Sequence, residues 1–300
     1  MLPRLAVTLA ALLCALCAPV ARAADAAWTV RPGGDRPYVY LEGVPGTVLE
    51  DTLSVTNPGT KPLTVRLRPA DAYNTETGAL AVRGARMSHA EGTWITLASE
   101  SVRVPPRTRA QIPFSVTVPP GALPGDHPGA IVAASGGREA GVRIHLRVSG
   151  PTLAAFTVEQ VSVSGGVIHY SLVNRGNTAL TPRVTIRADG LFGEVLRRAP
   201  RTLPVELLPA QRVTLTEKWP DHPSLDSVTV HVESTAPGDA RAKGSASATF
   251  VPWATVAGSA AGLLAAAGGT VWFLRRRRPA DPEPAPEQNG SERHLARSGA

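Results

Sequence analysis

An internal repeat restricts the fold of this chain more than any other feature of its sequence. Residues 53–64 align without gaps on residues 170–181, an offset of 117 positions. In each copy a hydrophobic alternation ends at Asn-x-Gly and resumes at Leu-Thr. Asn and Gly tolerate the backbone of a tight reversal, so each copy predicts two strands joined by a short turn. Another pattern occurs in both halves: a hydrophobic residue followed by proline precedes a further strand, at Val104-Pro-Pro106 and at Leu208-Pro209.

Short runs with period-two alternation fill the sequence from Trp28 to Val251, separated by Gly, Pro and Asn, and no window shows convincing helical spacing. Modules of roughly 100 to 120 residues have the size of immunoglobulin-like domains. We therefore predict an all-β chain of two tandem immunoglobulin-like β-sandwiches, over residues 24–149 and 150–251, divided at Ser149-Gly150-Pro151. The clearest predicted strands are 52–56, 63–67, 112–118, 142–148, 167–173, 184–187, 213–215 and 228–232.

The two copies differ in the length of one connection. From the turn asparagine to the later proline there are 49 positions in the first copy and 35 in the second. The additional residues fall between about 74 and 92, where we expect a long loop that only the first sandwich has. Long ordered connections of this kind often carry function.

The N-terminus has the order of a secretory signal peptide. Arg4 precedes an uncharged run over residues 5–20, and Ala21-Arg22-Ala23 provides an A-x-A cleavage signal, so residues 1–23 are predicted to be removed. The two cysteines of the chain, Cys14 and Cys17, lie within this segment. The mature chain then has no disulfide and no thiolate metal site, and each sandwich depends on its own hydrophobic core.

A second uncharged run lies near the C-terminus. Residues 253–274 are 22 positions without a charge, enough for one transmembrane helix, and Arg275 to Arg278 follow directly. The positive-inside rule places these arginines in the cytoplasm. We predict a single-pass protein of the cell membrane with its N-terminus outside and a disordered cytoplasmic tail over residues 275–300, rich in Pro.

Charge and motifs argue against nucleic-acid binding and catalysis. Residues 24–274 carry 23 basic and 20 acidic side chains, too balanced for a nucleic-acid-binding surface. The sequence has no H-E-x-x-H, no paired-histidine spacing and no G-x-S-x-G. His145, His169 and His231 each lie between apolar residues, at positions typical of the solvated face of a strand. We predict no enzyme activity, no metal site and no cofactor.

Four residues are candidates for ligand binding. Asp126 and His127 lie in a Pro/Gly-rich stretch that predicts a turn, where an aspartate can also simply cap its own backbone. Trp94 either stacks on a sugar face or fills the core, and Tyr73, like Tyr38, is more typical of a core position.

Several segments of the first sandwich carry a family resemblance: residues 38–46, 55–59 and 70–74 with Gly78, and most specifically residues 118–132. Over residues 28–149 the chain resembles the peptidoglycan-binding domain of WxL-interacting proteins from Gram-positive cell surfaces. The resemblance implies non-catalytic binding of peptidoglycan, a second β domain that contacts a cell-surface protein partner, and a C-terminal anchoring helix.

A second function remains open from the sequence alone. Exposed edges of the two sandwiches could accept a strand from a protein partner, as pilus chaperones do, without direct binding of glycan. The two hypotheses differ in whether the outer part of the chain binds the cell wall alone or only through another protein.

Overall fold

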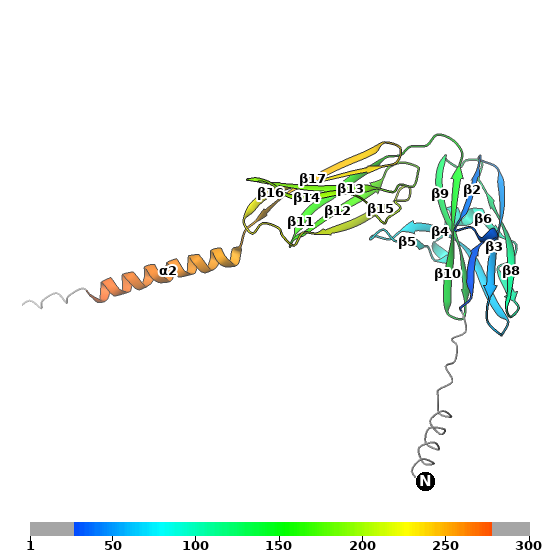
Figure 1. Cartoon of the computed structure of the whole chain (residues 1–300), viewed down its shortest axis with the longest axis horizontal. Coiled ribbons are helices and arrows are strands. Elements are labelled where there is room, and N and C mark those ends of the chain that lie inside the picture. Colours follow the sequence, from blue (N-terminus) through cyan, green and yellow to red (C-terminus); the bar gives the residue numbers. More distant parts are fainter. Residues whose placement is uncertain (1–26, 278–300) are drawn as a thin grey trace, which may run out of the picture. The chain divides into compact units, whose positions relative to one another are not determined.

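The first ten strands of this computed structural model, which describes residues 27–277, form one β-sandwich (Figure 1). One sheet has the order β1-β3-β8-β6, and the other has the order β2-β10-β9-β4, with β5 and β7 also paired to β4. All described pairings are antiparallel except that of β2 with β10. The strands are β1 (Thr29–Pro32), β2 (Val39–Gly43), β3 (Val48–Asn57), β4 (Leu63–Asn74), β5 (Leu80–Val82), β6 (Ile95–Leu97), β7 (Ser101–Val104), β8 (Thr108–Thr117), β9 (Gly125–Ser135) and β10 (Arg138–Val148).

The next seven strands form a second sandwich, with the sheet β11-β12-β15 facing the sheet β14-β13-β16-β17. This arrangement of antiparallel sheets, three strands facing four, is immunoglobulin-like. The predicted all-β class with two tandem sandwiches is thus confirmed. The strands are β11 (Phe156–Ser164), β12 (Val167–Asn174), β13 (Arg183–Gly190), β14 (Gly193–Thr202), β15 (Arg212–Lys218), β16 (Asp226–Ala236) and β17 (Ala240–Phe250).

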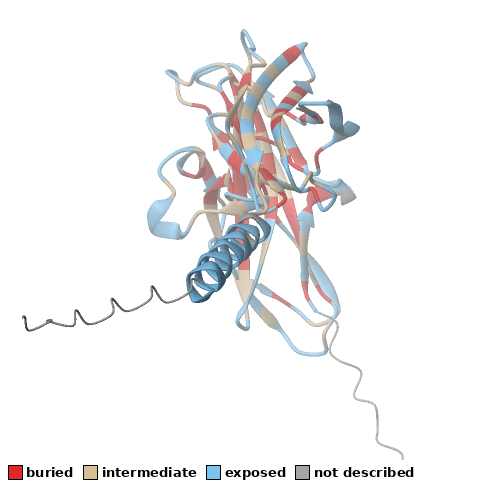
Figure 2. Ribbon diagram, turned by 90° about the vertical axis from the view of Figure 1, so that its left-hand side faces the viewer, coloured by how far each residue is buried: buried red, intermediate tan, exposed pale blue. Residues whose placement is uncertain are grey.

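Each sandwich has its own hydrophobic core, built from alternate residues of its strands. Figure 2 shows the buried positions as red bands along the strands. The core of the first sandwich includes Leu53, Phe114 and Ile131. The core of the second includes Tyr170 and Trp219, and Trp219 is only 1% exposed. The two sandwiches belong to one compact unit, which ends at Phe250.

The repeated asparagine has the same role in both sandwiches. Asn57 Nδ2 donates to the carbonyls of Lys61 (2.9 Å) and Val104 (3.1 Å), and Asn57 Oδ1 accepts from the backbone N–H of Gly59 (3.0 Å). These bonds close the turn after β3 and fasten it to the segment that precedes β8.

Asn174 repeats this pattern after β12. Its Nδ2 donates to the carbonyls of Thr178 (2.7 Å) and Leu207 (3.0 Å), and its Oδ1 accepts from the N–H of Gly176 (2.9 Å). The sequence repeat therefore marks equivalent turns, each held by one buried amide.

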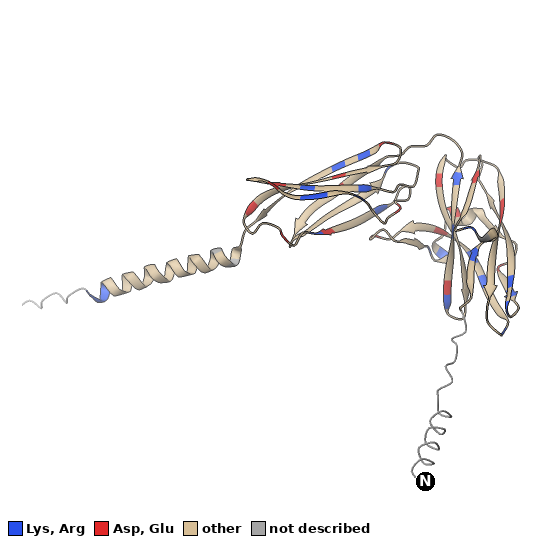
Figure 3. Ribbon diagram, viewed as in Figure 1, with Lys and Arg blue, Asp and Glu red and all other residues tan. Residues whose placement is uncertain are grey.

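The long helix α2 (Trp253–Arg276) follows the second sandwich as a separate unit. Its segment Ala257–Arg276 is long and apolar enough to cross a membrane, judged by length and composition. Figure 3 shows the helix without charged residues until its last turn, where Arg275 and Arg276 lie. The predicted signal peptide lies outside the described residues, as does the tail beyond Arg277.

Two local predictions differ from the structure. The turn predicted over the Pro/Gly-rich stretch ends at Pro124, and β9 begins at Gly125, so Asp126 and His127 lie in a strand. Their pairing with Arg147 and Leu146 of β10 extends the strand into the stretch. The segment predicted as one long loop contains the short strand β5 and two 3-10 helices, η2 (Ala85–Met87) and η3 (Glu91–Trp94). A further 3-10 helix, η1 (Gly33–Asp35), lies between β1 and β2.

Candidate functional site

A pocket of about 210 Å³ lies where the two sandwiches meet. Residues of the first sandwich line most of it, and the second sandwich contributes three. Since a site between two modules can combine side chains of both, this cleft is the candidate functional site. Its wall includes Tyr40, Arg143, His145 and Arg147 from the first sandwich, and Glu206 and Leu208 from the second.

The strand register explains why charged and aromatic side chains gather on this wall. In β10, Arg143, His145 and Arg147 alternate with buried aliphatic residues, so their side chains share the outward face of the sheet. Tyr40 of β2 lies opposite His145 in the parallel pairing, and Asp126 of β9 lies opposite Arg147. The same face therefore collects aromatic, basic and acidic groups from three neighbouring strands.

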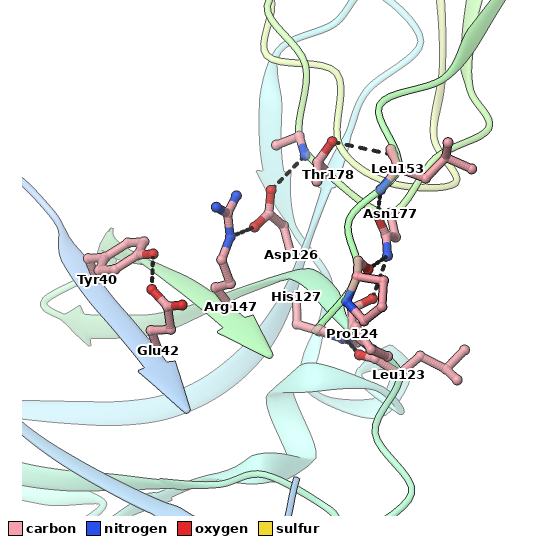
Figure 4. A network of polar contacts seen from close by, with 12 residues as sticks. Tyr40, Glu42, Leu123, Pro124, Asp126, His127, Arg147, Leu153, Asn177 and Thr178 are labelled. Atoms are coloured by element: carbon pink, nitrogen blue, oxygen red, sulfur yellow. Dashed lines mark hydrogen bonds and ion pairs between the residues drawn. The ribbon is translucent and has the colours of Figure 1, made fainter. Parts of the chain in front are cut away.

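Asp126 joins the two sandwiches. Its Oδ1 accepts from Arg147 Nε at 2.7 Å, and its Oδ2 accepts from the backbone N–H of Ala179 in the second sandwich at 2.8 Å. The backbone N–H of Asp126 also donates to the carbonyl of Asn177 at 2.7 Å. Figure 4 shows this network between β9, β10 and the turn after β12. The hydrogen bond to Asp126 raises the pKa of the Arg147 guanidinium.

Asn177 completes the network from the second sandwich. Its Nδ2 donates to the carbonyls of Pro124 (2.8 Å) and Pro151 (3.1 Å), and its Oδ1 accepts from the N–H of Leu153 (2.6 Å). Gly125 approaches it so closely that a Cβ there would lie 2.3 Å from the Asn177 carbonyl oxygen. With a φ of +128°, this position requires glycine for two independent reasons.

A second ionic contact crosses the cleft. The Arg143 guanidinium donates from both terminal nitrogens to the two carboxylate oxygens of Glu206, in a bidentate pair. The Arg143 side chain is 19% exposed and that of Glu206 is 35% exposed, so the pair is only partly screened by solvent.

The C-terminal end of β4 and the turn after it make the third contact between the sandwiches. Asn74 Nδ2 donates to the carbonyl of Glu206 at 2.8 Å, and Asn74 Oδ1 accepts from the N–H of Leu208 at 2.9 Å. Beyond it, the N–H of Thr214 donates to the carbonyl of Glu76 at 2.6 Å. The first part of the extra segment therefore holds the second sandwich, a role that the sequence did not reveal.

The four predicted ligand-binding residues do not meet at one place. Asp126 and His127 are neighbours in β9, so their side chains point to opposite faces of the sheet. Trp94, at the end of η3, packs on the first core, and its ring centroid lies 4.9 Å from that of His127. Tyr73 is half-buried in β4, and the Arg83 guanidinium lies over its ring, with the guanidinium carbon 4.7 Å from the ring centroid of Tyr73.

The position of Tyr38 also differs from the sequence prediction. It was expected in the core, but it is 49% exposed, because it precedes β2 next to the fully buried Val39 and faces outward. Its ring centroid lies 4.8 Å from that of His145. The strand histidines His145, His169 and His231 do lie on the outward side of their strands, as predicted, between buried neighbours. Within residues 27–277 no group of three or more His, Asp or Glu side chains could hold a metal ion.

Two histidines near the cleft have pKa values shifted in opposite directions. Burial works against the charged ring of His127, but the hydrogen bonds to Glu91 and the Leu123 carbonyl, with nearby negative charge, raise its pKa overall. Its Nδ1 lies 3.1 Å from Glu91 Oε1, and its Nε2 lies 2.8 Å from the Leu123 carbonyl oxygen. Both ring nitrogens thus face acceptors, which suits the imidazolium. Burial and the positive charge of Arg143 lower the pKa of His145.

These shifts predict opposite pH dependences for two variants. The stabilisation from His127 is present below the unfolded-state pKa of about 6.5 and is lost as the pH rises through its higher folded-state pKa. His127→Gln should therefore cost more unfolding free energy near pH 5.5 than near pH 8.5. For His145, folded-state stability falls as the pH drops below about 6.5, so His145→Gln should be relatively more stable at the lower pH. Urea titrations at the two pH values test both signs, and equal costs at both would contradict the assignments.

No family model matches the sequence, and no curated protein matches it. Solved structures similar to this chain include the Pseudomonas aeruginosa CupB2 chaperone, with 12% identity, a TM-score of 0.34, and coverage of 70% of this chain and 97% of that one. The E. coli chaperone DraB has 10% identity, a TM-score of 0.37, and coverage of 73% and 98%. The structure of the Salmonella enterica SafA pilin in complex with the SafB chaperone gives 13% identity, a TM-score of 0.38, and coverage of 76% and 99%. Similarity at this level carries no argument about function.

Proposed function

We propose that this chain is a membrane-anchored, non-catalytic protein of the cell surface that binds a protein partner. The observation that carries the proposal is one surface of the first sandwich beside the cleft, made by Tyr38, Tyr40, Arg143, His145 and Arg147, here called the Tyr-Arg face. Tyr38 is 49% exposed and Tyr40 is 46% exposed, although both are large and aromatic.

Tyrosine and arginine are the side chains that most often dominate the binding energy of protein interfaces. On the Tyr-Arg face they are held in place before any partner arrives, since Arg147 is bonded to Asp126, Arg143 to Glu206, and the Tyr40 hydroxyl donates to Glu42 at 2.7 Å. Side chains that are already ordered lose less conformational entropy on binding, which favours affinity.

The size of the cleft favours a protein over a small ligand. Its volume of about 210 Å³ is below the usual range of small-molecule pockets, roughly 300 to 1,000 Å³. Its best-placed charges are already paired with one another. A partner surface that covers the exposed tyrosine rings uses this geometry better than a sugar enclosed in the cleft.

The edges of the sheets limit how such a partner could add a strand. In the sheet that forms the Tyr-Arg face, β2 already covers the outer edge of β10. In the second sandwich, β14 pairs only with β13, and nine of its ten residues are exposed. β14 is thus an open edge to which a partner could add a strand as chaperones do, whereas the Tyr-Arg face would bind through side chains.

The helix and the N-terminal sequence together support the anchor. Helix α2 has the length and composition of a membrane span, with arginines at its C-terminal end. A cleaved signal peptide would place both sandwiches outside the cell and these arginines inside, in agreement with the positive-inside rule.

Site-specific cross-linking in intact cells tests the proposal. A photo-reactive amino acid in place of Tyr40 should give one discrete adduct with a protein, and the same group in place of Ser245, exposed on β17, should not. Tyr40→Ala should weaken binding of the captured partner about tenfold or more, which is about 1.4 kcal/mol, if Tyr40 is an anchor of the interface.

Sedimentation with purified peptidoglycan sacculi separates this function from wall binding. Binding of peptidoglycan by residues 28–149 stays a prediction of the sequence. If the chain sediments with sacculi without any other protein, and Tyr40→Ala leaves sedimentation unchanged, wall binding is the better function and the Tyr-Arg face is not its site.

A further inference from the structure

The tip of the β13–β14 hairpin exposes two large apolar side chains. Leu191 is 73% exposed and Phe192 is 97% exposed, and they form the two-residue loop between the paired Gly190 and Gly193. Loops of this length usually carry Asn, Asp or Gly, which are polar or small. Nothing in the turn geometry requires a leucine and a phenylalanine, so another property of this tip must favour them.

The tip lies at the end of the second sandwich from which the chain leaves toward helix α2. Asp226 Oδ1 accepts from the N–H of Leu191 at 3.1 Å, and Asp226 is paired with Phe250, the last residue of β17. Leu225, which directly precedes Asp226, is itself 69% exposed. Three exposed apolar side chains thus share one end of the sandwich with the chain exit.

Covalent connectivity keeps this end close to the helix. Only Val251 and Pro252 separate Phe250 from Trp253, where α2 begins. At no more than about 3.6 Å per residue, the path from Phe250 to Trp253 is at most about 11 Å. If α2 crosses a bilayer, this end of the second sandwich lies within reach of the headgroup region.

We propose that Leu191 and Phe192, with Leu225, insert into the headgroup region on the external side of the cell membrane, beside the anchoring helix. This inference rests on the proposed membrane anchor. Phenylalanine and leucine are the side chains that interfacial segments bury at the boundary between headgroups and acyl chains. Two or three such side chains bind a bilayer only weakly by themselves, but the anchor supplies a high effective concentration.

The charges around the tip favour apolar insertion over attraction to acidic lipids. Both acidic and basic side chains lie near the tip, among them Asp189, Asp226 and Arg197, and Arg197 is already paired with Glu194 at 2.6 Å. A mixed surface of this kind gains little from a negative membrane. Vesicles of phosphatidylcholine alone should therefore suffice. The second contact with the bilayer would restrict the tilt of the second sandwich about its short connection to the helix.

A single fluorescent label measures insertion. In the full chain with Cys14→Ser and Cys17→Ser, an environment-sensitive dye is attached at Leu225→Cys, which leaves Leu191 and Phe192 in place. The control carries the dye at Thr235→Cys, an exposed position next to the hairpin at the opposite end of β16. In phosphatidylcholine vesicles with spin-labelled headgroups, the dye at 225 should be quenched at least about threefold more than the dye at 235.

A second variant ties the quenching to the tip. Adding Phe192→Asp to Leu225→Cys should remove most of the difference from the control, while the unfolding temperature stays close to that of the parent, because Phe192 makes little contact with the protein. Equal quenching at 225 and 235 in chains that float with the vesicles overturns the insertion but leaves the anchor intact. Chains that do not float overturn the anchor and the insertion together. Shielding of the dye at 225 that depends on chain concentration, or on an added protein, assigns the tip to a protein contact and overturns the proposal.

Discussion

Asn174→Ala should lower the free energy of unfolding by about 2 to 4 kcal/mol, because it removes one amide that serves three backbone groups. The side chain of Asn174 is 1% exposed, so water cannot readily take its place. The variant leaves the carbonyls of Thr178 and Leu207 without this donor and the N–H of Gly176 without this acceptor. Asn57→Ala should have a similar cost, since Asn57 is 4% exposed and makes the equivalent bonds.

Urea denaturation of residues 24–250, followed by tryptophan fluorescence, measures both costs. Lys61→Ala is the matched control, because only the backbone carbonyl of Lys61 takes part in the turn and its side chain is exposed. That variant should stay within about 0.5 kcal/mol of the parent. If both asparagine variants cost less than about 1 kcal/mol, the turns do not depend on the amides and the shared role assigned to them is wrong.

The asparagine turns also show what the sequence could predict. The repeated Asn-x-Gly predicted two equivalent turns, and hydrophobic alternation predicted the strands on either side, since both signals are local. The partners of each amide were not predictable, because Val104 and Leu207 lie far along the chain from Asn57 and Asn174. The turn predicted over Asp126 and His127 was wrong for the same reason. Its local composition favours a turn, but pairing with the long strand β10 overrides that preference.

The site was only partly predictable. Alternation predicted that His145 faces solvent, and the structure places Arg143 and Arg147 on the same outward side of β10. Their acidic partners come from β9 and from the second sandwich, and a contact between two modules leaves no periodic signal in the sequence. Asp126 was selected for its position in a loop, whereas the structure gives it importance as a bridge between sandwiches. The distinction matters because a residue that bonds both sandwiches affects whether they unfold together or separately.

Removing two of the bridging side chains should uncouple the sandwiches. Asn74 is 6% exposed, and it accepts from Leu208 and donates to Glu206, while Asp126 holds Arg147 and the Ala179 N–H. Asn74→Ala with Asp126→Ala leaves several partly buried polar groups unpaired, at a cost of about 3 to 5 kcal/mol to the interface. Stability at that interface is what makes two modules unfold as one.

We expect calorimetry of residues 24–250 to show one main transition for the parent and two separate transitions for the double variant. Trp219 is the only tryptophan of the second sandwich. Once Trp28 and Trp94 are replaced by Phe, thermal unfolding followed by tryptophan fluorescence shows which transition belongs to the second sandwich. Glu42→Ala is the control for the calorimetry. Its hydrogen bond with Tyr40 lies within the first sandwich and does not cross the cleft, so this variant should still unfold in one main transition. The double variant should also weaken partner binding without any change to an exposed tyrosine, because Arg147 then loses the carboxylate that orders it. A double variant that still unfolds in one transition at an unchanged temperature would show that these contacts do not couple the sandwiches, and the partner surface would have to be sought on one sandwich alone.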